Sequence, residues 1–333
     1  MSDKLLVVKD LALHYFTSKG VVRALDGVSF DLAAGETLGL VGESGCGKTT
    51  TGVALLNMPS PPGRIVRGSI RIDGAEIVGM RDRELRTQVR WSRISMVFQG
   101  AMNSLTPVYT IRSLMLETFR AHTGTSGLEA AEAESLLRHY VSLVGLPEHV
   151  LGRYPHELSG GMKQRVVIAV ALFLEPKVII MDEPTTALDV IVQAQILNLI
   201  KRLKRDLHLS YIFITHDLAT EAEIADRIMV MYAGKVAEIG TNRQIFGDAG
   251  PLHPYTQKLL NATPRLRQKV SELAFIPGAP PDLIDPPTGC RFAPRCTFAK
   301  EKCRQVEPPI TRVEDQHQVA CWKAVEDPEY ARS

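Results

Sequence analysis

The sequence predicts an α/β fold built around a parallel sheet. Short apolar runs typical of buried strands recur along the chain, and helical patterns follow several of them. These runs cover residues 5–9, 37–40, 94–98, 178–181 and 211–215. Alternating strands and helices favour parallel strands, and continuous apolar runs such as residues 178–181 are typical of a sheet that is covered on both faces.

Two regions differ from this alternating pattern. Between Val108 and Pro155 the sequence predicts two helices, around residues 111–122 and 128–144, and we expect a helical subdomain inserted at about residues 108–165. After Pro264, prolines recur beside four of the five cysteines. We therefore expect one large domain over residues 1–263 and a Cys- and Pro-rich C-terminal module over residues 264–333, short of regular secondary structure.

The composition excludes several classes of protein. The 39 Lys and Arg nearly balance the 37 Asp and Glu, so composition gives no sign of nucleic-acid binding. The longest apolar run, residues 166–174, has nine residues, whereas a membrane-spanning helix needs about 20. The N-terminus lacks the long apolar core of a signal peptide. We expect the chain to stay in the cytosol without crossing a membrane.

A glycine-rich segment after the predicted strand at residues 37–40 matches the motif G-x-x-x-x-G-K-[ST]. Its residues are Gly42, Glu43, Ser44, Gly45, Cys46, Gly47, Lys48 and Thr49, and a helical stretch follows from Thr50. Glycines let backbone N–H groups turn toward phosphate oxygens, the lysine supplies a positive charge and the threonine hydroxyl can bind Mg²⁺. The alternative is a solvated glycine-rich turn, but the strand-to-helix context favours a phosphate-binding loop.

Two adjacent carboxylates end a predicted strand. Asp182 and Glu183 follow the apolar run at residues 178–181. Such a pair is suited to holding Mg²⁺ and polarising a water molecule. Alone, the pair is more typical of an ordinary strand-to-turn transition, and the phosphate loop upstream is what favours a catalytic role.

Several further motifs occur in a fixed order around these two. They are Gln99 after a predicted strand, the segment LSGGMKQR at residues 158–165, the segment TALD at residues 186–189, and His216 after another strand. With them, essentially the whole chain resembles an ATP-binding cassette ATPase. The resemblance implies a P-loop NTPase cassette with a RecA-like parallel-sheet core, an N-terminal antiparallel β part and the inserted helical subdomain.

The resemblance also implies a role for each matching residue. ATP would lie between two cassettes in a head-to-tail pair, so a second ATPase subunit is needed, either a second copy or a paralogue. The implied ATP contacts are Tyr15 on the adenine, Gly42, Glu43, Ser44, Gly45, Cys46, Gly47, Lys48, Thr49 and Thr50 on the phosphates, His216 on the γ-phosphate, and Ser159, Gly160 and Gly161 from the partner cassette. Phe16 is an alternative to Tyr15.

The same resemblance assigns the chemistry of hydrolysis. Glu183 would orient or deprotonate the attacking water, with Lys48 and His216 also acting on the phosphates. Mg²⁺ would be bound by Thr49, Gln99 and Asp182, and Asp189 would contact the opposing cassette. Independently of the resemblance, Ser159 is placed to cap a helix whose exposed N–H groups favour an anion, although the same local structure occurs without a ligand.

The segment HPYTQ at residues 253–257 and the Cys-rich tail resemble the oligopeptide and dipeptide importer branch of this family. That branch implies two transmembrane permease subunits, an extracellular solute-binding protein and a position on the cytoplasmic side of the inner membrane. The chain departs from the branch after Gln99, where Gly-Ala-Met follows, and at Thr106, where asparagine is usual. These departures lie in the region that contacts the membrane subunits, so they bear on the exact solute more than on the ATP chemistry. Within the branch, oligosaccharides and nickel are alternatives to peptides, because the cassette does not touch the transported solute.

The tail cysteines are Cys290, Cys296, Cys303 and Cys321, separated by five, six and seventeen residues. In the cytosol, metal binding or idle thiols are more common than disulfides. The spacing fits neither a zinc ribbon nor the standard ferredoxin run, and thiolates suit both metals. Resemblance to the importer branch favours a [4Fe–4S] cluster, with Zn²⁺ and unliganded thiols as alternatives.

These observations predict an ATPase that powers an importer, most simply of oligopeptides or dipeptides. A cassette ATPase acting in translation or DNA repair is a second hypothesis, but the sequence shows no second cassette, coiled-coil insert or basic patch. A redox- or iron-sensing regulator with a degenerate ATP site is a third, and the intact Lys48, Asp182, Glu183 and His216 argue against it.

Overall fold

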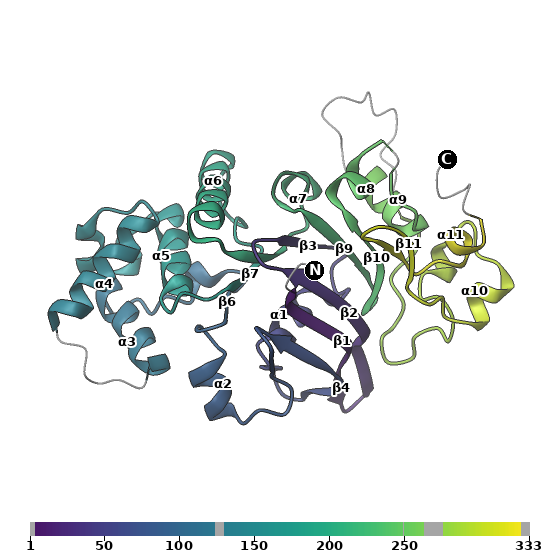
Figure 1. Cartoon of the computed structure of the whole chain (residues 1–333), viewed down its shortest axis with the longest axis horizontal. Coiled ribbons are helices and arrows are strands. Elements are labelled where there is room, and N and C mark those ends of the chain that lie inside the picture. Colours follow the sequence, from purple (N-terminus) through teal and green to yellow (C-terminus); the bar gives the residue numbers. More distant parts are fainter. Residues whose placement is uncertain (1–3, 124–129, 249, 263–275, 328–333) are drawn as a thin grey trace. The chain divides into compact units, whose positions relative to one another are not determined.

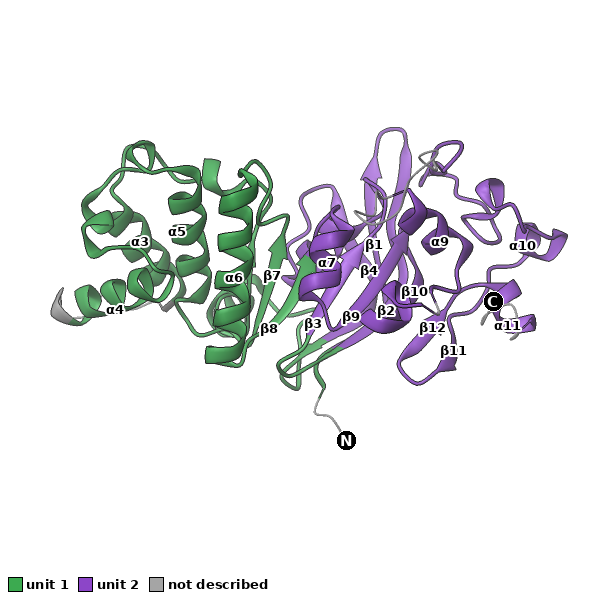
Figure 2. Ribbon diagram, turned by 90° about the horizontal axis from the view of Figure 1, so that it is seen from above, with its two compact units in different colours: residues 1–6, 32–36, 71–213 green, residues 7–31, 37–70, 214–333 purple. Residues whose placement is uncertain are grey.

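The computed structural model of the chain describes residues 4–123, 130–248, 250–262 and 276–327, shown in Figure 1. The chain forms two compact units, coloured separately in Figure 2. Unit 1 comprises Met1–Leu6, Leu32–Glu36 and Arg71–Phe213, and unit 2 comprises Val7–Asp31, Thr37–Ile70 and Ile214–Ser333. The boundary that the sequence predicts between residues 263 and 264 lies outside the described residues and stays a prediction.

Unit 1 combines short parallel strands with helices. Its main elements are β5 (Ala75–Glu76), α2 (Asp82–Gln88), β6 (Ile94–Val97), α3 (Ile111–Thr123), α4 (Ala130–Leu143), α5 (Gly160–Leu172), β7 (Val178–Asp182), α6 (Val190–Leu207) and β8 (Ser210–Ile214). Strands β6 and β7 pair in parallel, with Ile94 opposite Val178, and β8 lies on the other side of β7. Every residue of β7 and β8 is buried, which confirms the predicted apolar strands.

The helices expected between Val108 and Pro155 lie in unit 1, while the bounds of the subdomain, about residues 108–165, stay a prediction. Helices α3 and α4 match the two predicted segments, except for residues 128 and 129, which lie outside the described residues. Helix α4 also contacts α5, whose first turn carries the LSGGMKQR segment. Among the helices of the described residues, none is long and apolar enough to span a bilayer.

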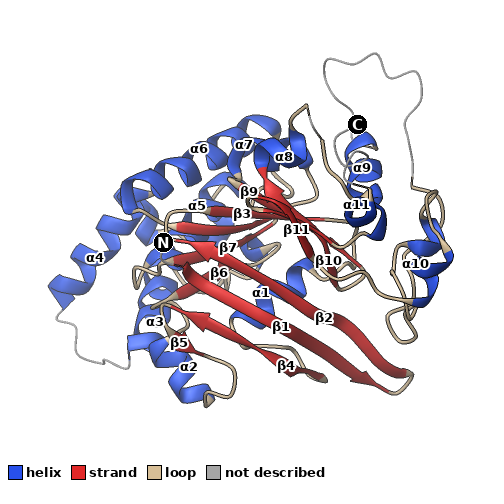
Figure 3. Ribbon diagram, turned by 45° about the vertical axis from the view of Figure 1, so that its right-hand side comes forward, coloured by secondary structure: helices blue, strands red, loops and turns tan. Residues whose placement is uncertain are grey.

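Unit 2 contains most of the strands, which are drawn in red in Figure 3. Its elements are β1 (Lys4–Thr17), β2 (Gly20–Ala33), β3 (Thr37–Val41), α1 (Lys48–Leu55), β4 (Gly63–Ile72), α7 (Leu218–Ile224), β9 (Arg227–Tyr232), β10 (Lys235–Thr241), α8 (Asn242–Phe246), α9 (Pro254–Asn261), α10 (Glu301–Gln305), β11 (Thr311–Glu314), β12 (His317–Val319) and α11 (Trp322–Glu326). One sheet has the order β2-β1-β4, and another has the order β11-β12-β10-β9-β3. In the second sheet β3 and β9 are parallel, while β9, β10, β12 and β11 pair antiparallel in turn.

The C-terminal segment contains more regular structure than the sequence predicts. Strand β12 pairs with β10 through Val319 opposite Glu238, so the segment extends the sheet of unit 2. Glu238 is fully buried and accepts hydrogen bonds from His317 Nε2 at 2.8 Å and from the backbone N–H groups of Leu252 and His253 at 2.7 and 3.1 Å. These three donors satisfy a carboxylate that would otherwise be costly to bury, and they fasten the segment to the sheet.

A second buried carboxylate, Glu221 on α7, packs against β3. An added Cβ on Gly39 would overlap its carboxylate, so only glycine fits opposite it. Burial raises the pKa of Glu221 well above its usual range, and the nearby charge of Asp217 acts in the same direction. Folding therefore favours the neutral form of this side chain.

We expect Glu221→Gln to stabilise the fold by an amount that grows with pH. A carboxyl whose pKa is raised in the folded state contributes stability that is fully present below its unfolded pKa of about 4.3 and is lost as pH rises toward the folded value. Glutamine is neutral throughout, so the variant should exceed wild type in Tm by several degrees more at pH 8 than at pH 5. Thermal unfolding at both pH values, with the exposed Glu223→Gln as control, checks this. A Tm difference independent of pH would contradict it.

Candidate active site

The phosphate-binding loop connects β3 to α1 in unit 2. Gly42, Gly45 and Gly47 have φ angles of 148°, 77° and 110°, in the region that favours glycine. An added Cβ at Gly42 would also collide with the carbonyl oxygen of Met231. The loop therefore takes a path that side chains would block.

Lys48 lies inside this loop. Its Nζ donates to the carbonyl oxygens of Gly42 at 2.6 Å and Glu43 at 3.1 Å, and the residue is buried. Helix α1 begins at Lys48 without a side-chain cap, so its first N–H groups point out of the helix end without a capping partner from a side chain. A positive helix end beside an ammonium group is an arrangement that binds phosphate. Ser44, Gly45 and Thr49 are exposed, which leaves this rim of the loop accessible.

Three polar side chains of unit 1 are hydrogen-bonded to one another just after two neighbouring strands. Glu183 follows β7 and Gln99 follows β6, and Gln99 Nε2 donates to Glu183 Oε2 at 2.8 Å. Thr186 Oγ1 donates to the same oxygen at 2.9 Å. Glu183 also has a φ of 48°, an unusual conformation for a residue other than glycine and one that clusters at functional sites. Two donors and a constrained backbone fix the direction of this carboxylate.

Asp182 is buried at the end of β7, directly before Glu183. The two carboxylates thus differ in environment, one enclosed in the sheet and the other at its edge. Carboxylate, hydroxyl and amide oxygens are ligands that Mg²⁺ accepts. Asp182 and Gln99 of unit 1 and Thr49 of unit 2 each carry an oxygen of this kind, and their shared role in binding Mg²⁺ stays a prediction.

Helix α5 begins within the LSGGMKQR segment, as the sequence predicts. Ser159 caps the helix, accepting from the backbone N–H of Met162 at 3.4 Å. Added Cβ atoms on Gly160 and Gly161 would lie 3.2 Å from Leu188 and 2.6 Å from Val192, respectively. The two glycines therefore also allow close packing against the start of α6, a requirement that the sequence pattern did not reveal.

Three other predicted residues lie at exposed or half-buried positions. Asp189 caps α6 by accepting from the backbone N–H of Val192 at 3.0 Å, and His216 follows β8 on the surface of unit 2. Tyr15 in β1 is half-buried, with its ring beside Gly63, whereas Phe16 is 45% exposed. The choice between the two aromatic residues for adenine contact stays a prediction.

The tail cysteines gather within unit 2, and none is in a disulfide. Burial, together with the charges of the other three cysteines, raises the pKa of Cys290 to about 12. Burial and the charge of Cys303 also raise the pKa of Cys296 and of Cys321. The thiols thus lie close enough to influence one another, although no three His, Cys, Asp or Glu side chains within the described ranges form a metal-binding arrangement.

Sequence reasoning missed two residues that contact the phosphate loop. Arg295 pairs with the carboxylate of Glu43, and the hydroxyl of Tyr255 accepts from its backbone N–H at 2.8 Å. Both residues belong to the C-terminal half of unit 2. Tyr255 lies in the HPYTQ segment that marks the importer branch, but nothing in the sequence pairs it with Glu43.

Comparison with known proteins identifies both regions of the chain. The family described as ABC transporter matches residues 25–186, and the family described as oligopeptide/dipeptide transporter, C-terminal region, matches residues 237–303. The dipeptide transport ATP-binding protein DppD of Bacillus subtilis is 45% identical over 99% of this chain and 97% of that protein. The oligopeptide transport ATP-binding protein OppD of Salmonella typhimurium is 46% identical over 98% of this chain and 96% of that protein.

Solved structures agree with the fold. The ATP-binding cassette MJ0796, in a dimeric post-hydrolysis state bound to ADP and Pi, has a TM-score of 0.62 and 26% identity, covering 72% of this chain and all of that chain. The cbiO1 subunit of the cbiONQ transporter complex of Clostridium perfringens has a TM-score of 0.62 and 29% identity, covering 74% of this chain and 92% of that chain.

Proposed function

This chain belongs to the ABC transporter family of ATP-binding proteins, and from that premise we propose that it is the ATP-hydrolysing subunit of an oligopeptide or dipeptide importer. The similarity to peptide-transport ATP-binding proteins supports this function because it extends through both the cassette and the C-terminal region. Oligosaccharide and nickel importers are the alternatives within the branch. The solute choice depends on other subunits, since this chain contains the ATP chemistry alone.

The phosphate loop holds the nucleotide in this proposal. Loop N–H groups and Lys48 contact the phosphates, Thr49 and Thr50 follow at the start of α1, and His216 contacts the γ-phosphate. Glu183 orients or deprotonates the attacking water, in the direction that Gln99 and Thr186 fix. Mg²⁺, bound through Thr49, Gln99 and Asp182, would neutralise charge on the phosphate oxygens.

Hydrolysis requires a second cassette, either another copy of this chain or a paralogue. Ser159, Gly160 and Gly161 then contact the nucleotide bound to the partner, and Asp189 contacts the opposing subunit. Val190 and Ile191, directly after Asp189, are 80% and 73% exposed, which is unusual for large apolar side chains unless a partner covers them. This apolar edge supports a subunit interface at the start of α6.

The membrane subunits have a candidate contact in unit 1. Val108 and Tyr109, which follow the Gln99 segment, are 72% and 51% exposed. We assign this surface to two permease subunits, with the chain on the cytoplasmic side of the inner membrane and a solute-binding protein outside. Gln99 lies shortly before this surface in the sequence and donates to Glu183, so movement of the permease can change the hydrolytic carboxylate.

Transport by the complete complex in proteoliposomes tests the solute assignment. ATP-driven accumulation of labelled di- and oligopeptides, compared with oligosaccharides and nickel, should favour peptides. Accumulation of only a sugar or nickel would reassign the solute and leave the ATPase in place. ATP-independent accumulation would contradict the proposed function.

We propose that the tail thiols bind a metal group, a [4Fe–4S] cluster with Zn²⁺ as the alternative. Four cysteines are the number of ligands that either group takes, but within the described residues no three of their thiols form a metal-binding arrangement. The group would serve to cross-link the segment that contains β11, β12, α10 and α11.

We expect Cys296→Ser to remove the metal and loosen the tail. Anaerobically purified wild type should contain about four iron and four sulfide per chain if the cluster is present, or about one zinc otherwise. The variant should lose most of this metal and become more sensitive to limited proteolysis after residue 276. Cys46→Ser, at the remaining cysteine, serves as the control and should keep the metal. Equal metal content in both variants would contradict the assignment.

A further inference from the structure

Arg295 connects the C-terminal segment directly to the phosphate loop. Its guanidinium forms a two-pronged ion pair with Glu43, from Nη1 to Oε2 at 2.6 Å and from Nη2 to Oε1 at 2.9 Å. It also donates to Tyr232 Oη at 3.2 Å and to the carbonyl oxygens of Ile276 and Pro277 at 3.1 and 2.9 Å. All five N–H donors of a guanidinium are thus used, so its position is closely fixed.

A second contact reaches the backbone of the same loop residue. Tyr255 Oη accepts from the Glu43 N–H at 2.8 Å. The ring is fully buried, with centroids 4.6 Å from Tyr232 and 5.3 Å from Phe292. Burial raises the pKa of Tyr255, so its hydroxyl stays neutral. Tyr255 therefore fixes the backbone of Glu43 through its N–H group.

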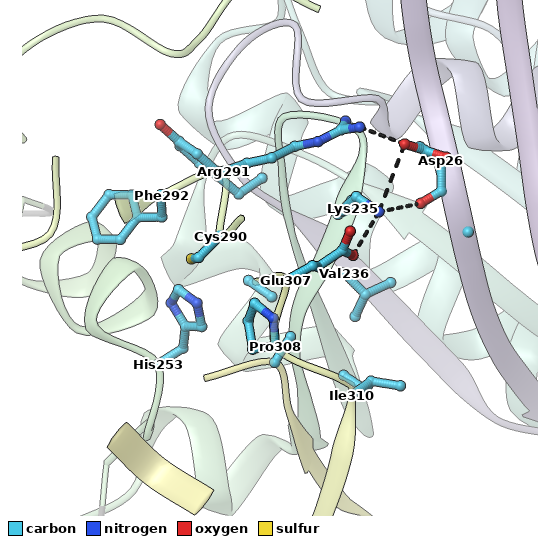
Figure 4. A pocket seen from close by; sticks show the side chains of 14 residues that line it. Asp26, Lys235, Val236, His253, Cys290, Arg291, Phe292, Glu307, Pro308 and Ile310 are labelled. Atoms are coloured by element: carbon cyan, nitrogen blue, oxygen red, sulfur yellow. Dashed lines mark hydrogen bonds and ion pairs between the residues drawn. The ribbon is translucent and has the colours of Figure 1, made fainter. Parts of the chain in front are cut away.

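The other end of the loop contacts the turn at Ala233 and Gly234, which the C-terminal segment also contacts. Gly234 N–H donates to the Cys46 carbonyl at 2.9 Å, and Arg291 Nη1 donates to the neighbouring carbonyl of Ala233. Arg291 also pairs with Asp26, which pairs in turn with Lys235, as Figure 4 shows. Two buried arginines, one at each end of the segment between Cys290 and Cys296, therefore brace the loop and its supporting turn.

We propose that Arg295 and Tyr255 are positioning residues for the nucleotide site. By fixing the side chain and the backbone of Glu43, they set the direction of the loop N–H groups and of Lys48, which donates to the Glu43 carbonyl. The C-terminal segment is thereby part of the machinery that binds nucleotide, and nucleotide affinity depends on its being correctly folded. This inference rests on the proposed function of the loop in ATP binding.

Nucleotide affinity of the full-length chain tests the proposal. Tyr255→Phe removes one hydroxyl and keeps the buried ring, and we expect it to weaken ATP binding by about 3- to 10-fold. Arg295→Gln should weaken it by about 10- to 100-fold because the hydrogen bonds lost are to a charged group. Arg304→Gln, at an exposed arginine of α10, is the matched control and should bind as wild type does. In transporters assembled with Tyr255→Phe or Arg295→Gln, the KM for ATP should rise while kcat stays unchanged.

A double-mutant cycle separates positioning from simple stability. If Arg295 acts through Glu43, Glu43→Gln combined with Arg295→Gln should bind ATP no more weakly than Arg295→Gln alone. Wild-type affinity in folded Tyr255→Phe and Arg295→Gln, with only a lower Tm, would overturn the proposal and assign both residues to stability. Absence of ATP binding by wild type would instead overturn the proposed function itself, so the two failures are distinguishable.

Discussion

Replacing Glu183 with glutamine should abolish ATP turnover while ATP binding remains. The amide has the shape of the carboxylate and its oxygen can still accept from Gln99 and Thr186, but it cannot take a proton from water. We expect kcat to fall by about 10²- to 10⁴-fold, the range typical for loss of a general base. ATP hydrolysis by the assembled complex and ATP affinity of the isolated chain are the two measurements.

The same variant should collect in the paired state, because ATP between the cassettes is no longer consumed. Size-exclusion chromatography with ATP and Mg²⁺ should show a dimer that wild type forms only transiently. Glu148→Gln, whose side chain is 60% exposed in the same unit, is the control and should behave as wild type does. Undiminished hydrolysis by Glu183→Gln would reject this residue as the base.

Replacing Lys48 with alanine should act earlier, on nucleotide binding itself. The ammonium is buried in the loop between the carbonyl oxygens of Gly42 and Glu43, where it supplies a positive charge to the phosphates. Loss of a charged hydrogen-bond donor should weaken ATP binding by about 10- to 100-fold. Titration with ATP checks this, with Lys300→Ala at a 68% exposed side chain as control. Unchanged affinity in Lys48→Ala would contradict the placement of the phosphates in this loop.

Local patterns in the sequence predicted the parts of the site that depend on a few neighbouring residues. The phosphate loop, the carboxylates at the end of β7 and the Ser159 cap of α5 each follow from residue types at short spacing. The buried strands could also be predicted from the sequence, because continuous apolar runs are unusual outside a covered sheet.

Contacts between distant residues could not be predicted in this way. Gln99 meets Glu183 only because β6 pairs with β7, and strand order is not readable from either strand alone. Arg295 and Glu43 are 252 positions apart. The pairing of β12 with β10 could not be predicted because nearby prolines argue against a strand there. The strand is stabilised by tertiary contacts, such as that of His317 with Glu238, which the local sequence does not reveal.

The burial of two acidic side chains could not be predicted from the sequence either. Asp and Glu are normally at the surface, so Glu221 and Glu238 gave no signal of burial in the sequence. The cost of burying the two carboxyl groups is reduced in different ways. Glu238 accepts hydrogen bonds from three donors, whereas the pKa of Glu221 is raised, which favours its neutral form. Only the arrangement of the neighbouring elements decides which of these outcomes applies.

ATP hydrolysis by the complete transporter, with and without peptide-loaded binding protein, tests most directly that this chain powers peptide import. The complex in proteoliposomes should release ADP and phosphate at a rate that rises several-fold when the peptide-loaded protein is added. Hydrolysis that is absent, or that continues unchanged in Lys48→Ala complexes and ignores the peptide, would contradict the assignment of this chain as the importer's ATPase.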